Sequence, residues 1–313
     1  MVIHETNIDT VTLQLDFDNT KAQRDKLSLL QQWITIRNLG LLESDCNSSS
    51  HVVKYNVYYA GTILFTIHSG STRIKDKLTN ELVNQYYIRI RFAGLKSHKQ
   101  RQDKASYDAL MTICAWLNTT RTNFRLVELD VAIDVNCSFY NVLAVCINKS
   151  ANVLYNPLNS IQYYDSIPTT YIEDYKKEEQ RKDAVLRAYL YNKSAKEGLD
   201  FVVTRFELKL QNRFFLKNEF DTNSIINALD RYWVMYFANE IEKERKICEY
   251  NKYKIVTTRE IDRLGFRSYR LYPNPAVIKE FMRQIKSVYV GFYWDIVIPL
   301  ASPNYKNHFF KKN

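Results

Sequence analysis

Glycine and proline are both scarce in this chain of 313 residues, with seven and six copies respectively. Their scarcity excludes collagen-like segments and long flexible linkers. No run approaches the ~18 consecutive apolar residues of a transmembrane helix, so we expect no membrane partner. Hydrophobic residues nevertheless make up 46% of the chain. That share, at this length, is typical of a globular protein with a substantial core.

Paired cysteines are also missing. The five cysteines are scattered and none forms a C-x-x-C pair. An odd number with irregular spacing indicates reduced, mostly buried thiols, and makes a zinc site unexpected. The N-terminal stretch 1–17 has neither the basic region nor the apolar region of a signal peptide. We therefore expect a cytoplasmic protein.

The charge is one-sided, with 44 Lys and Arg against 34 Asp and Glu, or +10 at pH 7. Such an excess favours a polyanionic partner, although a soluble protein that is merely basic stays open as an alternative. Aromatic residues reach 14% and include 23 tyrosines. Because aromatic rings stack on unpaired bases while Lys and Arg hold phosphates, the combination favours nucleic acid.

Hydrophobic periodicity predicts an α+β domain over 1–215 and a mainly helical region over 216–313, a candidate for DNA binding or oligomerisation. A long connection is expected over 149–183. Strands are expected at 8–17, 52–59, 62–68, 85–93, 124–135, 185–192 and 201–211. Helices are expected at 22–37, 105–118, 138–148, 221–249, 256–265 and 275–287.

The strand at 124–135 carries acidic residues on one side. Residues two apart in a strand share a face, so Glu128, Asp130 and Asp134 lie opposite an apolar side. Carboxylates about 7 Å apart repel each other, and a divalent cation relieves that repulsion. Carboxylate oxygens suit Mg²⁺ or Mn²⁺. An edge strand with a wet outer face is the structural alternative.

The predicted strands at 185–192 and 201–211 also have one apolar side and one polar side. Tyr189, Tyr191 and Lys193 share one face, and Arg205 and Glu207 share another. If the apolar sides cover one layer, the polar sides form a common surface of phenols, carboxylates and cations. That chemistry suits transesterification of a phosphodiester by a tyrosine, with Lys193 or Arg205 lowering the phenol pKa or holding the phosphate. Any single tyrosine is otherwise expected to pack or to stack on bases.

The segments RLVELDVAID (125–134), RAYLYNKSAKE (187–197) and TRFELKL (204–210) resemble the Rep_trans-type replication initiation factors of rolling-circle plasmids. The segment FAGLKSH (92–98) and the predicted first strand at 8–17 also resemble this family. The resemblance covers roughly residues 8–211. It implies an HUH-like fold, in which a central antiparallel sheet is backed by helices. It also implies that one DNA strand is nicked at an origin, with a covalent link between a tyrosine and the 5′ phosphate.

Carried over by position, the resemblance assigns the nucleophile to Tyr191, with Tyr189 as second choice. It assigns a Mg²⁺ or Mn²⁺ ion to Asp130 and Glu207. Glu128 stands where the family pattern is less acidic, and Glu128 or Asp134 would add a ligand or a supporting contact. The implied partner is origin DNA, single-stranded or cruciform. A host helicase and a homodimer stay open as further partners.

The histidines carry no metal motif. The His-hydrophobe-His pattern of other HUH nucleases is missing, and the five histidines are isolated. His68 lies beside a predicted turn, where a hydrogen-bonded or surface role is more common than metal binding. We therefore expect a metal site built from carboxylates.

A basic stretch follows the strand at 85–93 and is the expected DNA contact. A solvated charged loop is the alternative for its lysines. The residues expected to hold phosphates are Arg89, Arg91, Lys96, His98, Lys99, Arg101 and Lys104.

Three other classes of protein compete with this interpretation. A non-catalytic winged-helix initiator that binds origin repeats explains the charge and the tyrosines, but not the alternating carboxylates. A relaxase for conjugative transfer uses the same chemistry, and the sequence does not separate it from a replication protein. A tyrosine recombinase is disfavoured, because its catalytic domain is mainly helical.

Overall fold

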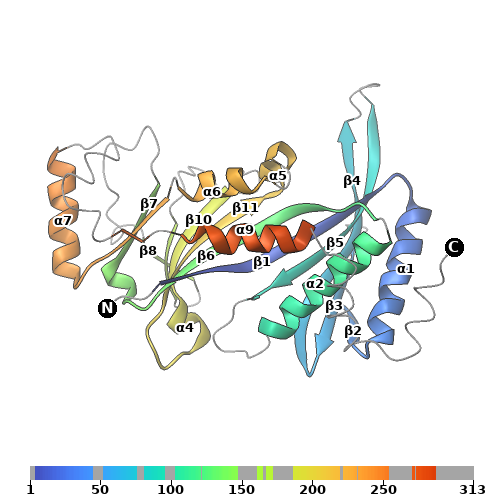
Figure 1. The fold of residues 1–313 in the computed structure, drawn as a ribbon, viewed down its shortest axis with the longest axis horizontal. Helices are drawn as coiled ribbons and strands as arrows, with labels where there is room; N and C mark the ends of the chain where they lie inside the picture. Colours follow the sequence, from blue (N-terminus) through green and yellow to red (C-terminus); the bar gives the residue numbers. More distant parts are fainter. Residues whose placement is uncertain are drawn as a thin grey trace. The chain divides into compact units, whose positions relative to one another are not determined.

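The computed structural model shows an α+β protein with two antiparallel sheets (Figure 1). The larger sheet has ten strands in the order β2-β3-β4-β5-β1-β6-β11-β10-β9-β8, and the smaller has the order β13-β12-β7. Helices back the large sheet, as the resemblance implies. The described residues are 4–44, 52–75, 81–95, 103–120, 122–146, 161–164, 167–171, 186–218, 221–230, 232–253, 270–271 and 273–286.

The chain forms two compact units, and each is built from separate stretches of sequence. Unit 1 comprises residues 1–9 and 129–280, and unit 2 comprises residues 10–128 and 281–313. Two long strands contribute to both units: β1 (His4–Phe17) and β6 (Arg125–Val135). The expected boundary near residue 215 falls inside unit 1, within α5 (Asn212–Asn218).

Unit 2 contains the hairpin and the two N-terminal helices that the sequence predicts. The chain turns at Ala60 and Gly61, whose φ angles of 48° and 81° lie in the left-handed region that glycine adopts without cost. Helix α1 starts after Asn19, whose side chain accepts a hydrogen bond from the backbone of Ala22. The elements of this unit, besides β1, are α1 (Thr20–Ile36), β2 (Gly40–Ser44), β3 (Val53–Tyr59), β4 (Thr62–Lys75), β5 (Leu82–Ala93) and α2 (Asp103–Thr119).

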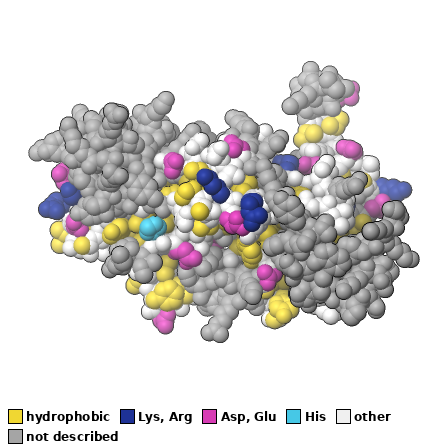
Figure 2. Space-filling model, in the orientation of Figure 1, with side chains coloured by type: hydrophobic (Ala, Val, Ile, Leu, Met, Phe, Trp, Pro, Cys, Tyr) yellow, Lys and Arg dark blue, Asp and Glu magenta, His cyan; other side chains and the backbone are white. Residues whose placement is uncertain are grey.

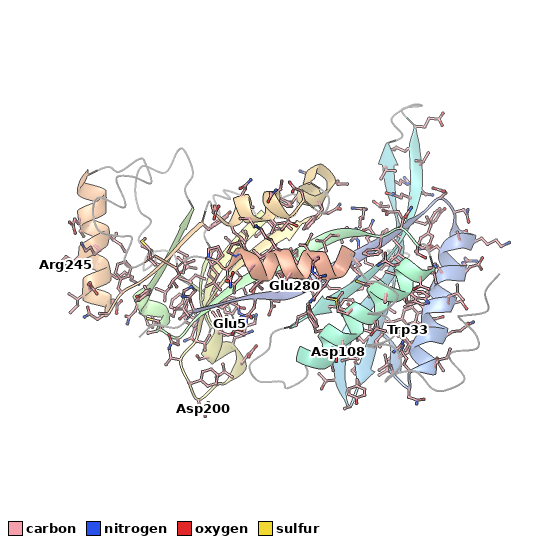
Figure 3. The ribbon with its side chains drawn as sticks, in the orientation of Figure 1. Glu5, Trp33, Asp108, Asp200, Arg245 and Glu280 are labelled. Atoms are coloured by element: carbon pink, nitrogen blue, oxygen red, sulfur yellow. The ribbon has the colours of Figure 1, made fainter. Side chains whose placement is uncertain are left out.

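One face of the unit 2 sheet is apolar and forms the core beneath the two helices. Alternate residues of β5 and β4 point to this face and are almost completely buried, among them Ile88, Ile90, Phe92 and Ile67. Trp33 on α1 is also buried (Figure 3). Helices α1 and α2 lie side by side over this face (Figure 1).

Unit 1 contains the strands that carry the tyrosine motif. β10 (Leu186–Asn192) pairs with β11 (Thr204–Gln211) on one side and with β9 (Ile167–Tyr171) on the other. β8 (Ile161–Tyr164) pairs with β9. The expected connection over 149–183 therefore contains two strands. Its rich polar content hid them from a search for alternating apolar residues.

The smaller sheet corrects two predicted helices. The segment 138–148 forms a short 3₁₀ turn, η1 (Phe139–Asn141), and then β7 (Val142–Cys146). The segment 221–249 is not one helix, because β12 (Tyr232–Tyr236) separates α6 (Thr222–Leu229) from α7 (Glu240–Tyr253). β12 pairs with β7 and with β13 (Arg270–Leu271). Short apolar runs suit a strand as well as a buried helix, and pairing decides between them.

The C-terminal prediction is confirmed in part. α9 (Pro275–Lys286) matches the helix expected at 275–287. The helix expected at 256–265 lies outside the described residues. None of the helices in the described part of the chain has the length and apolar character needed to cross a membrane.

Candidate active site

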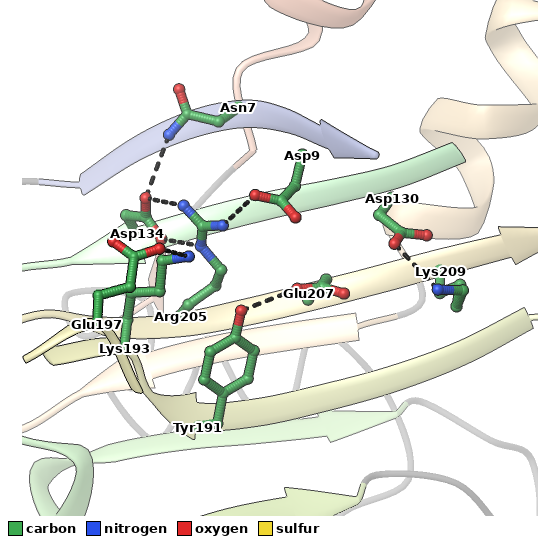
Figure 4. Close-up of polar contacts among 10 residues, drawn as sticks. All are labelled: Asn7, Asp9, Asp130, Asp134, Tyr191, Lys193, Glu197, Arg205, Glu207 and Lys209. Carbon is green, nitrogen blue, oxygen red and sulfur yellow. Dashed lines mark hydrogen bonds and ion pairs between the residues drawn. The ribbon is translucent and has the colours of Figure 1, made fainter. Parts of the chain in front are cut away.

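Strands β10 and β11 bring the sequence motifs together on one face of unit 1. In their antiparallel register Tyr191 lies opposite Arg205 (Figure 4), and Tyr189 lies opposite Glu207. The intervening residues point to the other face and are buried there, including Leu190 and Phe206. Phe206 contacts the ring of Tyr232 in the smaller sheet. We call the polar side the tyrosine face, made of Tyr189, Tyr191, Arg205, Glu207 and Lys209.

Tyr191 and Glu207 are joined by a hydrogen bond. The phenolic hydroxyl donates to Oε2 of Glu207 at 3.0 Å, and Tyr191 is 6% exposed. Burial raises the pKa of Tyr191 above its ordinary value, and the charge of Glu207 raises it further. The charge of Arg205 lowers this pKa, as the sequence suggested, but burial and the charge of Glu207 have the larger effect. The net pKa of Tyr191 is therefore raised, and the Glu207 carboxylate is the group in contact with the phenolic proton.

Strand β10 ends at Asn192, one residue after Tyr191, so Lys193 does not belong to the strand. Asn192 caps the short helix α4 (Lys193–Glu197), because its side chain accepts a hydrogen bond from the backbone of Ala195 at 2.9 Å. Lys193 is therefore the first residue of a helix and not a member of the strand. Its buried ammonium group forms an ion pair with Glu197.

Lys196 contacts Tyr191 from the same helix. Its ammonium nitrogen lies 4.6 Å from the centre of the Tyr191 ring, within the range of a cation–π interaction. Lys196 itself is exposed. Sequence reasoning missed this residue, since the strand pattern gives no information about a side chain that folds back from a helix.

Arg205 forms a buried cluster with two carboxylates. Its side chain is completely buried and donates to both oxygens of Asp134, at 2.5 and 2.7 Å. A third hydrogen bond goes to Asp9 at 2.5 Å. This bidentate geometry is the strongest form of an arginine–carboxylate pair. Arg205 therefore fixes β1, β6 and β11 to one another in unit 1.

Asp130 and Glu207 lie on the adjacent strands β6 and β11. Lys209 donates to Oδ2 of Asp130 at 3.1 Å, and Arg205 contacts Asp134. Glu207 lies between Arg205 and Lys209 along β11 and shares their face of the sheet, so it lies on the side of β11 that contacts the carboxylates of β6.

The four carboxylates expected to bind a metal are thus not equivalent. Both oxygens of Asp134 are engaged by Arg205. Glu128 belongs to unit 2, where it accepts hydrogen bonds from Thr12 at 2.6 Å and Arg91 at 3.1 Å. In the described part of the chain no three His, Cys, Asp or Glu residues gather to hold a metal ion.

Asp130 and Glu207 remain as a candidate pair of ligands. Their chemistry fits Mg²⁺ or Mn²⁺, since Mg²⁺ is commonly bound through one or two carboxylates and completes its shell with water and phosphate oxygens.

The residues expected to contact DNA lie in unit 2 or outside the described residues. Arg89 and Arg91 are on β5. Lys104 is in α2, and nothing is described of its side chain. Outside the described residues are Lys96, His98, Lys99 and Arg101.

Proteins similar to this chain were found among solved structures. No family model and no curated protein matches the chain. A solved structure of a rolling circle replication initiator protein from Geobacillus stearothermophilus is similar in fold, with 12% sequence identity and a TM-score of 0.38. The match covers 87% of this chain and 99% of that one.

Proposed function

We propose that this protein nicks one strand of DNA at an origin through Tyr191 and thereby initiates rolling-circle replication. The observation that carries the proposal is the hydrogen bond between the Tyr191 hydroxyl and Glu207. It supplies a nucleophile and a base in contact, which is the arrangement that nucleophilic catalysis requires. The large sheet and the carboxylates beside the phenol support the same function.

The chemical step is an exchange of one phosphodiester for another. Glu207 takes the phenolic proton as the Tyr191 oxygen attacks phosphorus, so that a Tyr–O–P bond forms and the P–O3′ bond breaks. The departing 3′ oxygen takes a proton from water. A base is needed because the pKa of Tyr191 is raised, and a free phenolate is therefore rare near neutral pH. The products are a 5′-phosphotyrosine link and a 3′ hydroxyl.

Other residues of the site position these groups. The cluster of Arg205, Asp134 and Asp9 holds the strands that carry Tyr191 and Glu207. Lys196 packs over the phenol ring, with its ammonium nitrogen 4.6 Å from the ring centre. A cation near the phenol would favour the negative charge that develops on the phosphate during attack. Asp130 and Glu207 would hold a divalent ion, which would polarise the scissile phosphate when bound.

The experiment that tests the proposal uses supercoiled DNA from the parent genetic element. The full chain is incubated with this DNA in Mn²⁺ or in excess EDTA, and covalent protein–DNA adducts are sought after denaturation. Relaxed DNA and an adduct at Tyr191 in Mn²⁺ support the proposal. Binding without relaxation or adduct would instead support a non-catalytic initiator. Nicking at a transfer origin would identify a relaxase with the same chemistry.

A further inference from the structure

Unit 2 carries a polar surface of its own on the sheet formed by β3, β4 and β5. Lys54 lies opposite His68 in the β3–β4 register, and His68 lies opposite Arg89 in the β4–β5 register. Arg91 lies two residues beyond Arg89 and therefore on the same side. We call these four residues, Lys54, His68, Arg89 and Arg91, the basic face.

The basic face lies on the side of the sheet away from the helices. Alternate residues on the same strands, such as Ile67 and Ile90, point to the opposite side and are completely buried. Helices α1 and α2 lie over the sheet of unit 2 (Figure 1). The members of the basic face are partly exposed, and 38% of the Arg91 side chain is accessible. On the side of the molecule drawn in Figure 2, by contrast, Lys and Arg side chains are scattered among acidic ones.

Neighbouring side chains hold the two arginines in place. Nε of Arg89 donates to the side-chain oxygen of Gln14 at 2.6 Å, and the guanidinium lies 4.4 Å from the centre of the Tyr87 ring. Nε of Arg91 donates to Glu128 at 3.1 Å. A guanidinium has five N–H donors in a fixed plane, so each of these contacts uses only part of its capacity. Arginines ordered in this way lose little conformational freedom when they bind a planar or tetrahedral anion.

The basic face places positive charges side by side across three neighbouring strands. Adjacent strands lie about 4.8 Å apart, so that Lys54, His68 and Arg89 form a row roughly 10 Å wide. The positive charges of the basic face act on His68, since Lys54, Arg89 and Arg91 all lower its pKa. Glu128 is the acidic group that opposes them there. A row of ordered cations on a sheet attracts a polyanion more strongly than an isolated anion.

We propose that the basic face binds the phosphodiester backbone of DNA. The inference rests on the proposed function, which makes DNA the substrate. It goes beyond that function by assigning a DNA-binding surface to unit 2 that is built from strands and includes Lys54 and His68. The phosphates come from either duplex or single-stranded DNA, and the two sources differ in the salt dependence of binding.

The test compares two pairs of substitutions in the full chain. Each pair is made in a Tyr191→Phe background, so that cleavage does not disturb the measurement. Lys54→Gln with Arg89→Gln removes two charges from the basic face. Lys21→Gln with Arg24→Gln is the matched control, because both residues are exposed on α1. Fluorescence anisotropy with labelled duplex and single-stranded oligonucleotides gives the affinity over a series of salt concentrations.

We expect the basic-face variant to bind more weakly and to lose salt dependence. Each lost phosphate contact reduces the slope of log K against log salt by roughly 0.9 on duplex DNA or 0.7 on single strands. Losing two contacts should therefore reduce it by about 1.8 or about 1.4. The control should keep the slope of the Tyr191→Phe parent. Thermal unfolding checks that both variants fold. Should the first variant fail to fold, Lys54→Gln with His68→Gln replaces it, and the same loss of slope is expected in smaller degree.

The two proposals fail in different ways. Equal slopes for the basic-face variant and the control would overturn the inference, even if the wild-type protein forms a covalent adduct. An absent adduct with a reduced slope would overturn the proposed function and leave the basic face as a DNA-binding surface.

Discussion

The phenol of Tyr191 and the carboxylate of Glu207 are joined diagonally across β10 and β11 by a hydrogen bond of 3.0 Å. The residue directly opposite Glu207 is Tyr189. Two phenols therefore lie near one carboxylate on the tyrosine face, and Tyr191 donates a hydrogen bond to it. Since a base acts on the proton it contacts, this relationship favours Tyr191 as the nucleophile.

Replacing Tyr191 with Phe should abolish the covalent adduct. The substitution removes the hydroxyl and keeps the ring, so the contact with Lys196 and the packing of β10 should persist. We expect a loss of stability of about 1 kcal/mol for the missing hydrogen bond. Tyr189→Phe is the matched control and should retain nicking. An adduct that survives in the first variant and disappears in the second would show that Tyr189 is the nucleophile.

Replacing Glu207 with Gln should slow nicking without weakening DNA binding. The amide has nearly the same shape as the carboxylate but is a poor proton acceptor. General-base catalysis contributes typically 10²–10⁴-fold to a rate, and we expect a decrease of about that size. Single-turnover nicking measured beside oligonucleotide binding separates the two effects. A variant that binds DNA poorly but nicks normally once bound would exclude a role for Glu207 as the base.

Replacing Asp130 with Asn should weaken Mn²⁺ binding and the dependence of nicking on the metal. The ion–carboxylate interaction is lost while the side chain keeps its size. Asp200→Asn is a suitable control, because Asp200 is exposed on the loop after α4 (Figure 3). Binding of Mn²⁺ alone can be followed by electron paramagnetic resonance. Wild-type nicking that persists in excess EDTA would defeat the metal hypothesis.

Replacing Arg205 with Met should destabilise the protein severely. Arg205 is completely buried, and its removal leaves Asp134 and Asp9 without their cation. Breaking a buried ion pair on one side typically costs 3–5 kcal/mol, and we expect a loss of about that size. Urea unfolding measures it, with Arg125→Met as a control at an ion pair with Asp16 whose two side chains are 31% and 29% exposed. An Arg205→Met protein of unchanged stability would indicate that Arg205 serves a ligand and not the fold.

The division of each strand into two faces could be predicted from the sequence. The period of two along 124–135 and 201–211 placed Asp130, Asp134, Arg205 and Glu207 on polar sides, and the structure places them there. This prediction works because the direction of a side chain in a strand is a local property. The catalytic and metal-binding roles of these residues stay predictions.

The partners of these residues could not be predicted, because they depend on contacts distant in the sequence. Arg205 meets Asp9, which is 196 positions away, and no local pattern links the two. The sequence suggested that Arg205 lowers the phenol pKa or holds phosphate. The charge of Arg205 does lower the pKa of Tyr191, but nothing in the sequence indicated its two carboxylate partners, Asp134 and Asp9. Lys193 was predicted to lie in the strand, because the alternation of polar residues continues to that position. The structure instead begins helix α4 at Lys193, with Asn192 as its cap.

The errors in secondary structure have a common physical cause. Val142–Cys146 and Tyr232–Tyr236 are short apolar segments that pair with each other. Each alone suits a buried helix as well as a strand, and their pairing partner lies about 90 residues away. Helix α9 was predicted correctly, since Pro275 begins it and its apolar residues recur at helical spacing.

The last prediction concerns pH and His68 on the basic face. In the free protein burial lowers the pKa of His68, and the charges of Lys54, Arg89 and Arg91 lower it further, whereas Glu128 raises it. Without DNA, stability should therefore decrease as the pH falls below the ordinary histidine value of about 6.5, because the unfolded chain takes up the proton more readily. The His68→Gln variant should be less sensitive to acid.

DNA binding should respond to acid in the opposite direction. A bound phosphate brings negative charge to His68 and raises its pKa, so that binding takes up a proton. Affinity should therefore increase as the pH falls through the region below about 6.5, by at most tenfold per pH unit for one proton, and stay level above it. The measurement is oligonucleotide anisotropy at constant ionic strength in the Tyr191→Phe background, with His4→Gln as a control at an exposed histidine of β1. The pH dependence should be lost in His68→Gln and kept in His4→Gln. If both variants keep it, the proton is taken up elsewhere and His68 does not face the phosphates.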